Sequence, residues 1–191
     1  QLAFACASHS GEARHVRMAG DWLAGIGLSE PDLRCGAHEP SDRAERDRLI
    51  KTDESPCQLH NNCSGKHCGF LTVTRHLGAG PEYVDLDHPL QRMIRQTTEE
   101  VTQETVAGHG IDGCSAPNFA MSISGLARAM QAFAAARDSG DRRSRAMHRL
   151  AKAMATWPEN VAGEGRACTE LMRAMGHKVA IKTGAEAVFV A

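Results

Sequence analysis

The chain has 191 residues, 42% of them hydrophobic, which is enough to bury the core of one sizeable domain. Its formal net charge of −1 and its 4% aromatic content argue against a nucleic-acid partner or an anionic membrane surface. No apolar stretch approaches the ~20 residues that span a bilayer. The opening QLAFACASHS also lacks the basic start and the long apolar core of a signal peptide. We therefore expect a cytoplasmic protein.

The cysteine content points the same way. An odd number of cysteines, irregular spacing and no export signal predict reduced thiols, either buried or bound to a metal. The seven positions are Cys6, Cys35, Cys57, Cys63, Cys68, Cys114 and Cys168. Both ends of the sequence look cut, because it starts at Gln1 and stops at Ala191 directly after a strand-like run.

The first half of the chain predicts helices separated by loops. Residues 2–7 are a short apolar run that reads as a strand and leads into Ser8. A helix follows, with apolar side chains at helical spacing and glycines at its end: Val16, Ala19, Leu23, Ile26, Gly25 and Gly27. Ser41 is the candidate cap of a second, charged helix that runs through Arg48. Residues 61–69 show neither helical nor strand periodicity and predict a tight or functional loop.

The second half is also mainly helical. Asp87 and Pro89 mark a helix start, and residues 108–117 predict a glycine-rich loop. The predicted helices cover residues 87–101, 121–137, 147–154 and 171–175. Two short strands, 179–181 and 187–190, are expected around a Lys-Thr-Gly turn. The pattern indicates one domain or two interleaved halves.

Lys182 and Ser8 are the first candidates for chemistry. Lys182 follows a strand and precedes Thr and Gly, as in serine acyl-transferases of the β-lactamase and penicillin-binding group. Such a lysine can stabilise developing negative charge or transfer a proton. Ser8 lies between the apolar run and a helix, where its hydroxyl would be accessible near backbone N–H groups. A solvated lysine before a turn and a helix-capping serine are the alternatives.

Two further segments are rich in metal-binding side chains. Thiolates and imidazoles are the usual zinc ligands, and no CxxC pair singles out any of them here. The residues alone leave five candidates: Cys57, Cys63, His67, Cys68 and Cys114. Asp112 precedes Cys114 in a loop of the Asp-Gly type, which a plain turn also explains.

Four segments in fixed order carry a family resemblance: CASHSGE, NNCSGKHCGFL, DGCSAPNFAMSISGLARAM and KTGAE. Together they resemble the rhizobial-type L-asparaginases, the asparaginase II family of bacteria. The likeness runs through nearly the whole chain, including residues 87–91 and Gly165-Arg166. Several long motifs in one order are more specific than any single one of them.

The resemblance implies an α/β (α+β) fold like that of the serine β-lactamases, in which helices sandwich an antiparallel sheet and a helical insert is added. It implies an L-asparagine amidohydrolase that releases aspartate and ammonia and forms a homodimer. The family uses two serine–lysine tandems, and Ser8 with Lys182 matches one of them. Asp112 would orient the substrate beside its amino group, and His9 and Arg166 would contact the substrate.

The resemblance also implies a zinc site. Its ligands would be Cys63, Lys66 and Cys114, with water as the fourth, in place of the His67 ligand favoured by residue type. A lysine ligand must be neutral, so its pKa must fall through burial and the cation.

The sequence departs from the family in one important respect. The other tandem, a Ser-x-x-Lys that holds the presumed nucleophile, has no match in the chain. In the family it precedes the CASHSGE segment, so we expect residues 1–191 to be a single domain that lacks this segment and C-terminal strands. Cys68 and Ala187 stand where a small residue and a glycine are expected. The alternative function is therefore a non-catalytic truncated homologue or a zinc-stabilised binding domain.

Overall fold

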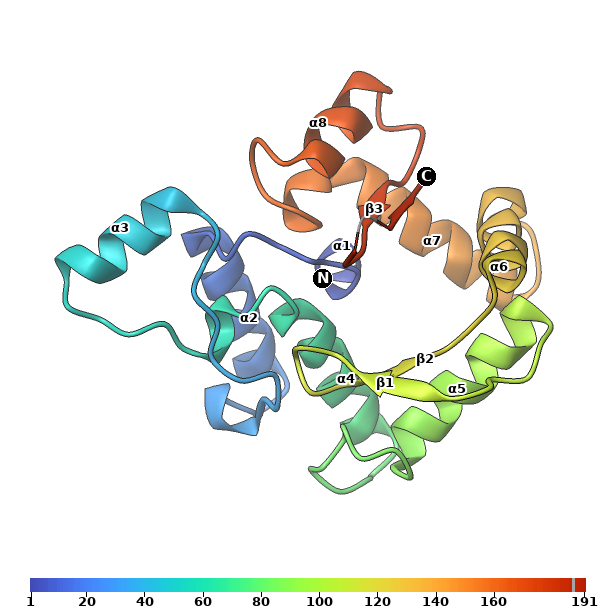
Figure 1. Cartoon of the computed structure of the whole chain (residues 1–191), viewed down its shortest axis with the longest axis horizontal. Helices are drawn as coiled ribbons and strands as arrows, with labels where there is room; N and C mark the ends of the chain where they lie inside the picture. The colour runs from blue at the N-terminus through green and yellow to red at the C-terminus, as the bar shows by residue number, and fades with distance from the viewer. Residues whose placement is uncertain (187) are drawn as a thin grey trace.

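The computed structural model describes residues 1–186 and 188–191, and Figure 1 shows their arrangement. Helices dominate these residues: α1 (Leu2–Ala5), α2 (Ala13–Gly25), α3 (Arg43–Lys51), α4 (Ser64–His76), α5 (Pro89–Thr102), α6 (Ile123–Ala135), α7 (Arg142–Thr156) and α8 (Ala167–Ala174). Three short 3-10 helices connect them: η1 (Glu30–Asp32), η2 (Gln58–His60) and η3 (Pro158–Asn160). No helix among the described residues is long and apolar enough to cross a membrane.

The strands form two antiparallel hairpins. β1 (His109–Ile111) pairs with β2 (Pro117–Phe119), with His109 opposite Phe119. β3 (Lys182–Thr183) pairs with β4 (Phe189–Val190), with Lys182 opposite Val190. The expected mixture of helices and antiparallel strands is confirmed. In the part of the chain that the structure describes, the strands make these two-stranded sheets.

Side-chain caps explain where several helices begin. Asp42 accepts a hydrogen bond from the N–H of Glu45 at the start of α3, and Ser122 accepts one from Gly125 at the start of α6. At α5 the imidazole of His88 accepts from the N–H of Leu90, and Pro89 occupies the first helical position. The predicted start of this helix at Asp87 and Pro89 is thus confirmed to within two residues.

The helices are arranged as a ring. Contacts join α1 to α4, α4 to α5, α5 to α6, α6 to α7 and α7 back to α1, and Figure 1 shows α1 in the middle of the molecule. One hydrophobic core lies among α1, α2, α4 and the segment before α5, with Phe4 and Tyr83 fully buried. A smaller core around Val161, Met172 and Ile181 packs on the other side of α1. The N-terminal helix therefore belongs to both cores.

Two predictions about the N-terminal half are wrong. Residues 2–7 were expected as a strand, but Leu2–Ala5 is helical, in keeping with the helix propensity of Leu and Ala. Residues 61–69 were expected as a loop, but α4 begins at Ser64. Gly65 packs against α1 so closely that a Cβ there would lie 2.1 Å from the carbonyl oxygen of Phe4. The start of α4 is buried through small and polar residues, and so it lacks the apolar periodicity that identifies a helix.

The remaining elements follow the sequence more closely. The helices predicted at 121–137, 147–154 and 171–175 correspond to α6, α7 and α8. The loop predicted at 108–117 contains β1 and the first residue of β2, so the short strands there were missed. Two strands around a turn near the C-terminus are confirmed, with the first at Lys182–Thr183. Ala187, assigned to the second predicted strand, lies outside the described residues.

Candidate functional site

A cavity of about 810 Å³ gathers the predicted site residues. Its lining comes from the end of α1, the start of α4, the turn between β1 and β2, and β3. Of the predicted site residues, those that line it are Ser8, Cys63, Lys66, Asp112, Cys114, Arg166 and Lys182. Three of the four segments behind the family resemblance contribute a thiol, a lysine or a carboxylate, and the CASHSGE segment contributes Ser8. The fold thus joins segments that are far apart in sequence.

Cys63, Lys66, Asp112 and Cys114 form what we call the thiol cluster. Donor atoms of Cys63, Asp112 and Cys114 all lie within 4.8 Å of one another. Lys66 Nζ lies 3.1 Å from Cys114 Sγ and 3.2 Å from Asp112 Oδ2. Four chemically different donors therefore converge at one edge of the cavity.

Local structure explains this convergence. Cys63 caps the N-terminus of α4, and Lys66 follows three residues later on the same side of the helix. Asp112 and Cys114 lie in the turn of the β1–β2 hairpin. There, the N–H of Ser115 donates to the carbonyl of Asp112 at 2.8 Å, and Ser115 has a φ of 69°. A helix start and a tight turn thus face each other.

The charges in the thiol cluster are coupled. A hydrogen bond from Cys63 lowers the pKa of Cys114 strongly, with help from His67 and from the charge of Lys66. The same hydrogen bond and burial raise the pKa of Cys63, so the cluster favours a single thiolate on Cys114. Burial disfavours charge on Lys66, but Cys63 and Cys114 outweigh it and raise the pKa of Lys66. The protein groups alone therefore keep Lys66 protonated, and a neutral Lys66 ligand needs a cation to displace that proton.

The donor set suits zinc. Zn²⁺ binds thiolate sulfur together with nitrogen or oxygen in a tetrahedral arrangement, and sulfur atoms at bonding distance from one ion lie within about 4 Å of each other. The spacing of Cys63, Asp112 and Cys114 agrees with this requirement. Asp112 adds an oxygen donor that the sequence assigned to substrate orientation. His67 does not belong to the described group of donors that lie within 4.8 Å of one another.

Ser8 and Lys182 line the same cavity, and each has its own partner. Ser8 Oγ accepts a hydrogen bond from Asn62 Nδ2 at 3.3 Å, and Lys182 Nζ donates to the carbonyl of Thr183 at 2.5 Å. Burial lowers the pKa of Lys182, and the nearby charge of Lys66 lowers it further, against the opposing effects of Cys168 and Cys63. A lysine with a lowered pKa is better suited to exchange protons near neutral pH.

Arg166 and His9 lie in contrasting positions. Arg166 is exposed at the start of α8, lines the cavity and approaches Ser41 Oγ at 3.4 Å. The His9 side chain is outside the cavity lining and only 2% exposed. Its Nε2 bonds Ser64 Oγ at 3.0 Å, and its Nδ1 accepts from the N–H of Gly11. This burial gives no support to a direct substrate contact by His9, which stays a prediction from the sequence.

His9 belongs to a second polar group, the histidine cluster of Phe4, His9, His15 and Ser64. The ring centroids of His9 and His15 lie 4.6 Å apart, and both rings stack on Phe4. Nδ1 of His15 accepts from the N–H of Glu12, and its Nε2 donates to the carbonyl of Glu159 at 2.9 Å. Both imidazoles are fully used inside the protein.

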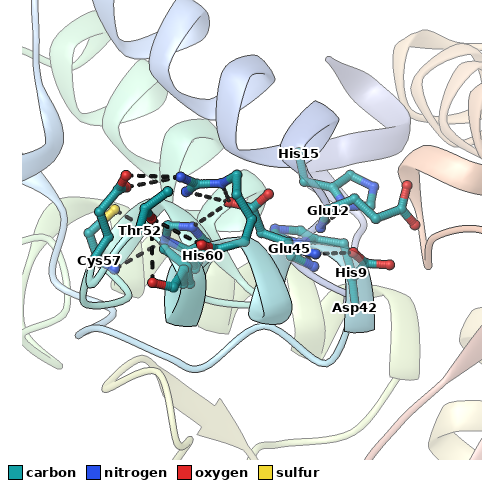
Figure 2. A network of polar contacts seen from close by, with 12 residues as sticks. His9, Glu12, His15, Asp42, Glu45, Thr52, Cys57 and His60 are labelled. Atoms are coloured by element: carbon teal, nitrogen blue, oxygen red, sulfur yellow. Dashed lines mark hydrogen bonds and ion pairs between the residues drawn. The ribbon is translucent and has the colours of Figure 1, made fainter.

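Cys57, a candidate zinc ligand by residue type, lies in another network, which Figure 2 shows. Its Sγ lies 3.3 Å from His60 Nδ1, and His60 Nε2 lies 3.3 Å from Glu45 Oε1. Cys57 and His60 also cap η2 reciprocally through their backbone N–H groups. Arg48 holds Glu45 from the other side at 2.8 Å. This Cys–His–Glu arrangement is accounted for by its role in fixing η2 to α3.

Asn62 is a site residue that the sequence analysis missed. It lines the cavity and donates to Ser8 Oγ. The available signal was its position beside Cys63 in the NNCSGK segment. An asparagine before a helix is so often a turn residue that this position alone did not indicate a function.

Comparison with known families assigns the chain. The model of the L-asparaginase II family matches residues 1–191. The chain belongs to the L-asparaginase II family. A comparison with curated proteins gave no match. Membership places this L-asparaginase II chain among hydrolases that act on L-asparagine, and the predicted family is confirmed.

Proposed function

We propose that the cavity binds L-asparagine and that serine–lysine acyl transfer hydrolyses its side-chain amide to aspartate and ammonia. The observation that carries this proposal is the convergence of Ser8, Lys182 and the thiol cluster on one cavity. In such a reaction a serine attacks the amide carbonyl, ammonia leaves, and water releases the acyl group as a carboxylate. Membership of the L-asparaginase II family supports the choice of substrate.

In this proposal Ser8 and Lys182 act as a proton-transferring tandem. The lowered pKa of Lys182 favours a population of neutral amine that can accept a proton. Ser8 Oγ accepts from Asn62, which leaves its own proton free to be donated toward the cavity. The sequence contains no Ser-x-x-Lys, so we assign no primary nucleophile within residues 1–191.

Charged side chains at the cavity suit the two ends of a free amino acid. The carboxylate of Asp112 is proposed to pair with the substrate's ammonium group, and Arg166 with its α-carboxylate. Both side chains are exposed to the cavity and belong to different elements, the β1–β2 turn and the start of α8. Such pairs would orient the amide carbon toward the tandem.

We further propose that Cys63, Lys66 and Cys114 hold zinc, with water or Asp112 completing the set. Bound zinc would supply a fixed positive charge at the cavity edge. Cys63 and Cys114 would provide thiolates, and Lys66 would have to release its proton to bind. The close approach of these groups supports the site.

Ammonia release from L-asparagine, measured on the complete gene product, tests the tandem. Lys182→Ala is expected to reduce the rate by about 10²–10⁴-fold, since proton transfer by a positioned group contributes on this scale. Lys178→Ala is the matched control, because Lys178 is exposed and precedes β3. Equal rates for the wild type and a folded Lys182→Ala protein would refute the assignment.

Metal analysis tests the zinc site separately from activity. Cys63→Ser and Cys114→Ser are expected to lose bound zinc, while Cys57→Ser, which alters a thiol outside the cavity lining, retains it. Retention of one equivalent in both cluster variants would exclude the proposed ligands.

The lack of a Ser-x-x-Lys favours a second candidate, a zinc-stabilised domain that binds without hydrolysis. It predicts calorimetric binding of L-asparagine by the complete gene product with no ammonia released. The homodimer implied by the resemblance remains a prediction, and sedimentation of the purified protein tests it.

A further inference from the structure

His67 is a buried histidine directly beside the thiol cluster that the proposed reaction does not use. It follows Lys66 on α4, and its side chain is 0% exposed. Its Nδ1 lies 2.7 Å from the hydroxyl of Tyr83, which is itself 0% exposed. A polar pair of this kind, deep in the main core, requires a full account of its hydrogen atoms.

The partners of Tyr83 fix the tautomer of His67. The hydroxyl oxygen accepts the backbone N–H of Arg34 at 2.7 Å. The hydroxyl hydrogen then has His67 Nδ1 as its acceptor, since these two are the partners that Tyr83 Oη has among the described residues. With Nδ1 accepting, a neutral imidazole carries its hydrogen on Nε2.

That Nε2–H is directed at Cys114. The imidazole reaches the thiol as a donor, and it is one of the groups that favour a thiolate there. The approach falls outside ordinary hydrogen-bond limits, so within the described part of the chain Nε2 is a buried donor without a regular partner. Leaving such a donor unpaired costs about 1–3 kcal/mol, so a modest movement of the sulfur or the ring toward each other would be favourable.

We propose that His67 is a positioning residue that holds the sulfur of Cys114 through Nε2–H, with Tyr83 fixing the tautomer, and thereby strengthens zinc binding. This inference rests on the zinc site of the proposed function. An N–H donor to a ligating thiolate fixes its orientation and leaves a lone pair for the ion. Outer partners of metal ligands typically contribute 10–100-fold to metal affinity. Direct ligation by His67 Nε2 would need the opposite tautomer, which the hydroxyl of Tyr83 disfavours.

Zinc affinity, measured by competition with a chromogenic chelator, tests this relay. His67→Leu removes the donor at similar volume and is expected to weaken zinc binding by about 10–100-fold. His67→Gln retains a side-chain N–H and should recover part of that loss. Tyr83→Phe removes a single oxygen and should fall between the two, and it keeps the test valid if His67→Leu fails to fold. Circular dichroism and the thermal midpoint report on folding in each variant.

Cobalt substitution provides a readout that a merely structural role would not move. Loss of the N–H donor should shift the thiolate-to-cobalt charge-transfer band in His67→Leu and Tyr83→Phe relative to the wild type. Folded variants with wild-type affinity and an unshifted band would overturn the positioning role. If His67→Gln lost zinc as completely as Cys114→Ser, His67 would be a ligand and the inference would be wrong. Zinc retention by Cys63→Ser and Cys114→Ser would instead refute the underlying zinc site.

Discussion

Cys63 and Ser64 are consecutive residues at the start of α4, yet they belong to two buried polar groups of opposite character. Ser64 joins the histidine cluster, in which both nitrogens of His9 and of His15 have partners inside the protein. Cys63 joins the thiol cluster, in which donors of four types meet at a cavity. The first group is complete without a ligand, whereas the second concentrates charges that suit one.

The comparison teaches how to interpret buried titratable groups. Burial lowers the pKa of both His9 and His15, as it would for a catalytic histidine, yet their contacts describe packing. In the thiol cluster the side chain of Asp112 is 43% exposed, so the group remains open to the cavity. The completeness of hydrogen bonding separates the two clusters better than the size of a pKa shift.

The largest effect is expected where α4 packs on α1 beneath the histidine cluster. Gly65→Ala would place a Cβ 2.1 Å from the carbonyl oxygen of Phe4 and 2.8 Å from its ring. Overpacking of this kind costs about 1–3 kcal/mol or more, and backbone cannot easily move aside. Gly20→Ala is the matched control, because that position in α2 has no atom within 4 Å of the added Cβ. It should stabilise the protein by up to about 1 kcal/mol.

Urea unfolding of both alanine variants measures this difference. Similar unfolding free energies for Gly65→Ala and Gly20→Ala would show that α1 does not pack on α4 as described.

The next effect is a loss of stability in mild acid. Burial, followed by the charge of His15, holds the pKa of His9 well below its usual 6.5, and burial lowers the pKa of His15 as well. The unfolded chain therefore binds protons that the native state does not as the pH falls below about 6.5. Each of these histidines should reduce the free energy of unfolding by up to about 1.4 kcal/mol per pH unit in that range.

Urea unfolding from pH 8 to pH 5 measures this slope. His9→Gln keeps polar groups but removes one titration, so it should flatten the curve. Carboxylates with lowered pKa values, such as Glu45 held by Arg48, lose their contribution only below about 4.5 and so do not mimic the effect. A stability that is independent of pH between 8 and 5 would contradict the neutral histidine cluster.

The smallest effect on stability is expected in the thiol cluster. Asp112→Asn removes one charge of a partly exposed pair with Lys66, and such pairs contribute about 0–1 kcal/mol. The thermal midpoint should hardly change, whereas binding of L-asparagine, measured by calorimetry, should weaken. A large loss of stability would mean that this cluster, like the histidine cluster, serves the fold.

The sequence identified much of the candidate site because its evidence is local. Cys63 and Lys66 are three residues apart, Asp112 and Cys114 share one turn, and Lys182 stands in a Lys-Thr-Gly segment. Seven of the eight predicted site residues line the cavity, and the exception is His9. Its neighbour Ser8 reaches the cavity, but His9 turns into the core, a difference that adjacent positions in a sequence do not reveal.

The amphipathic helices, their caps and the family were thus determined by the sequence alone, since each depends on residues close together or on motif order. Tertiary structure decided that residues 2–5 are helical, that α4 begins at Ser64, and that the β1–β2 turn meets α4. Each of these depends on the approach of Gly65 to Phe4 or of Lys66 to Asp112 and Cys114. Contacts between distant segments leave no periodicity in either segment, so only the folded chain shows which groups become neighbours.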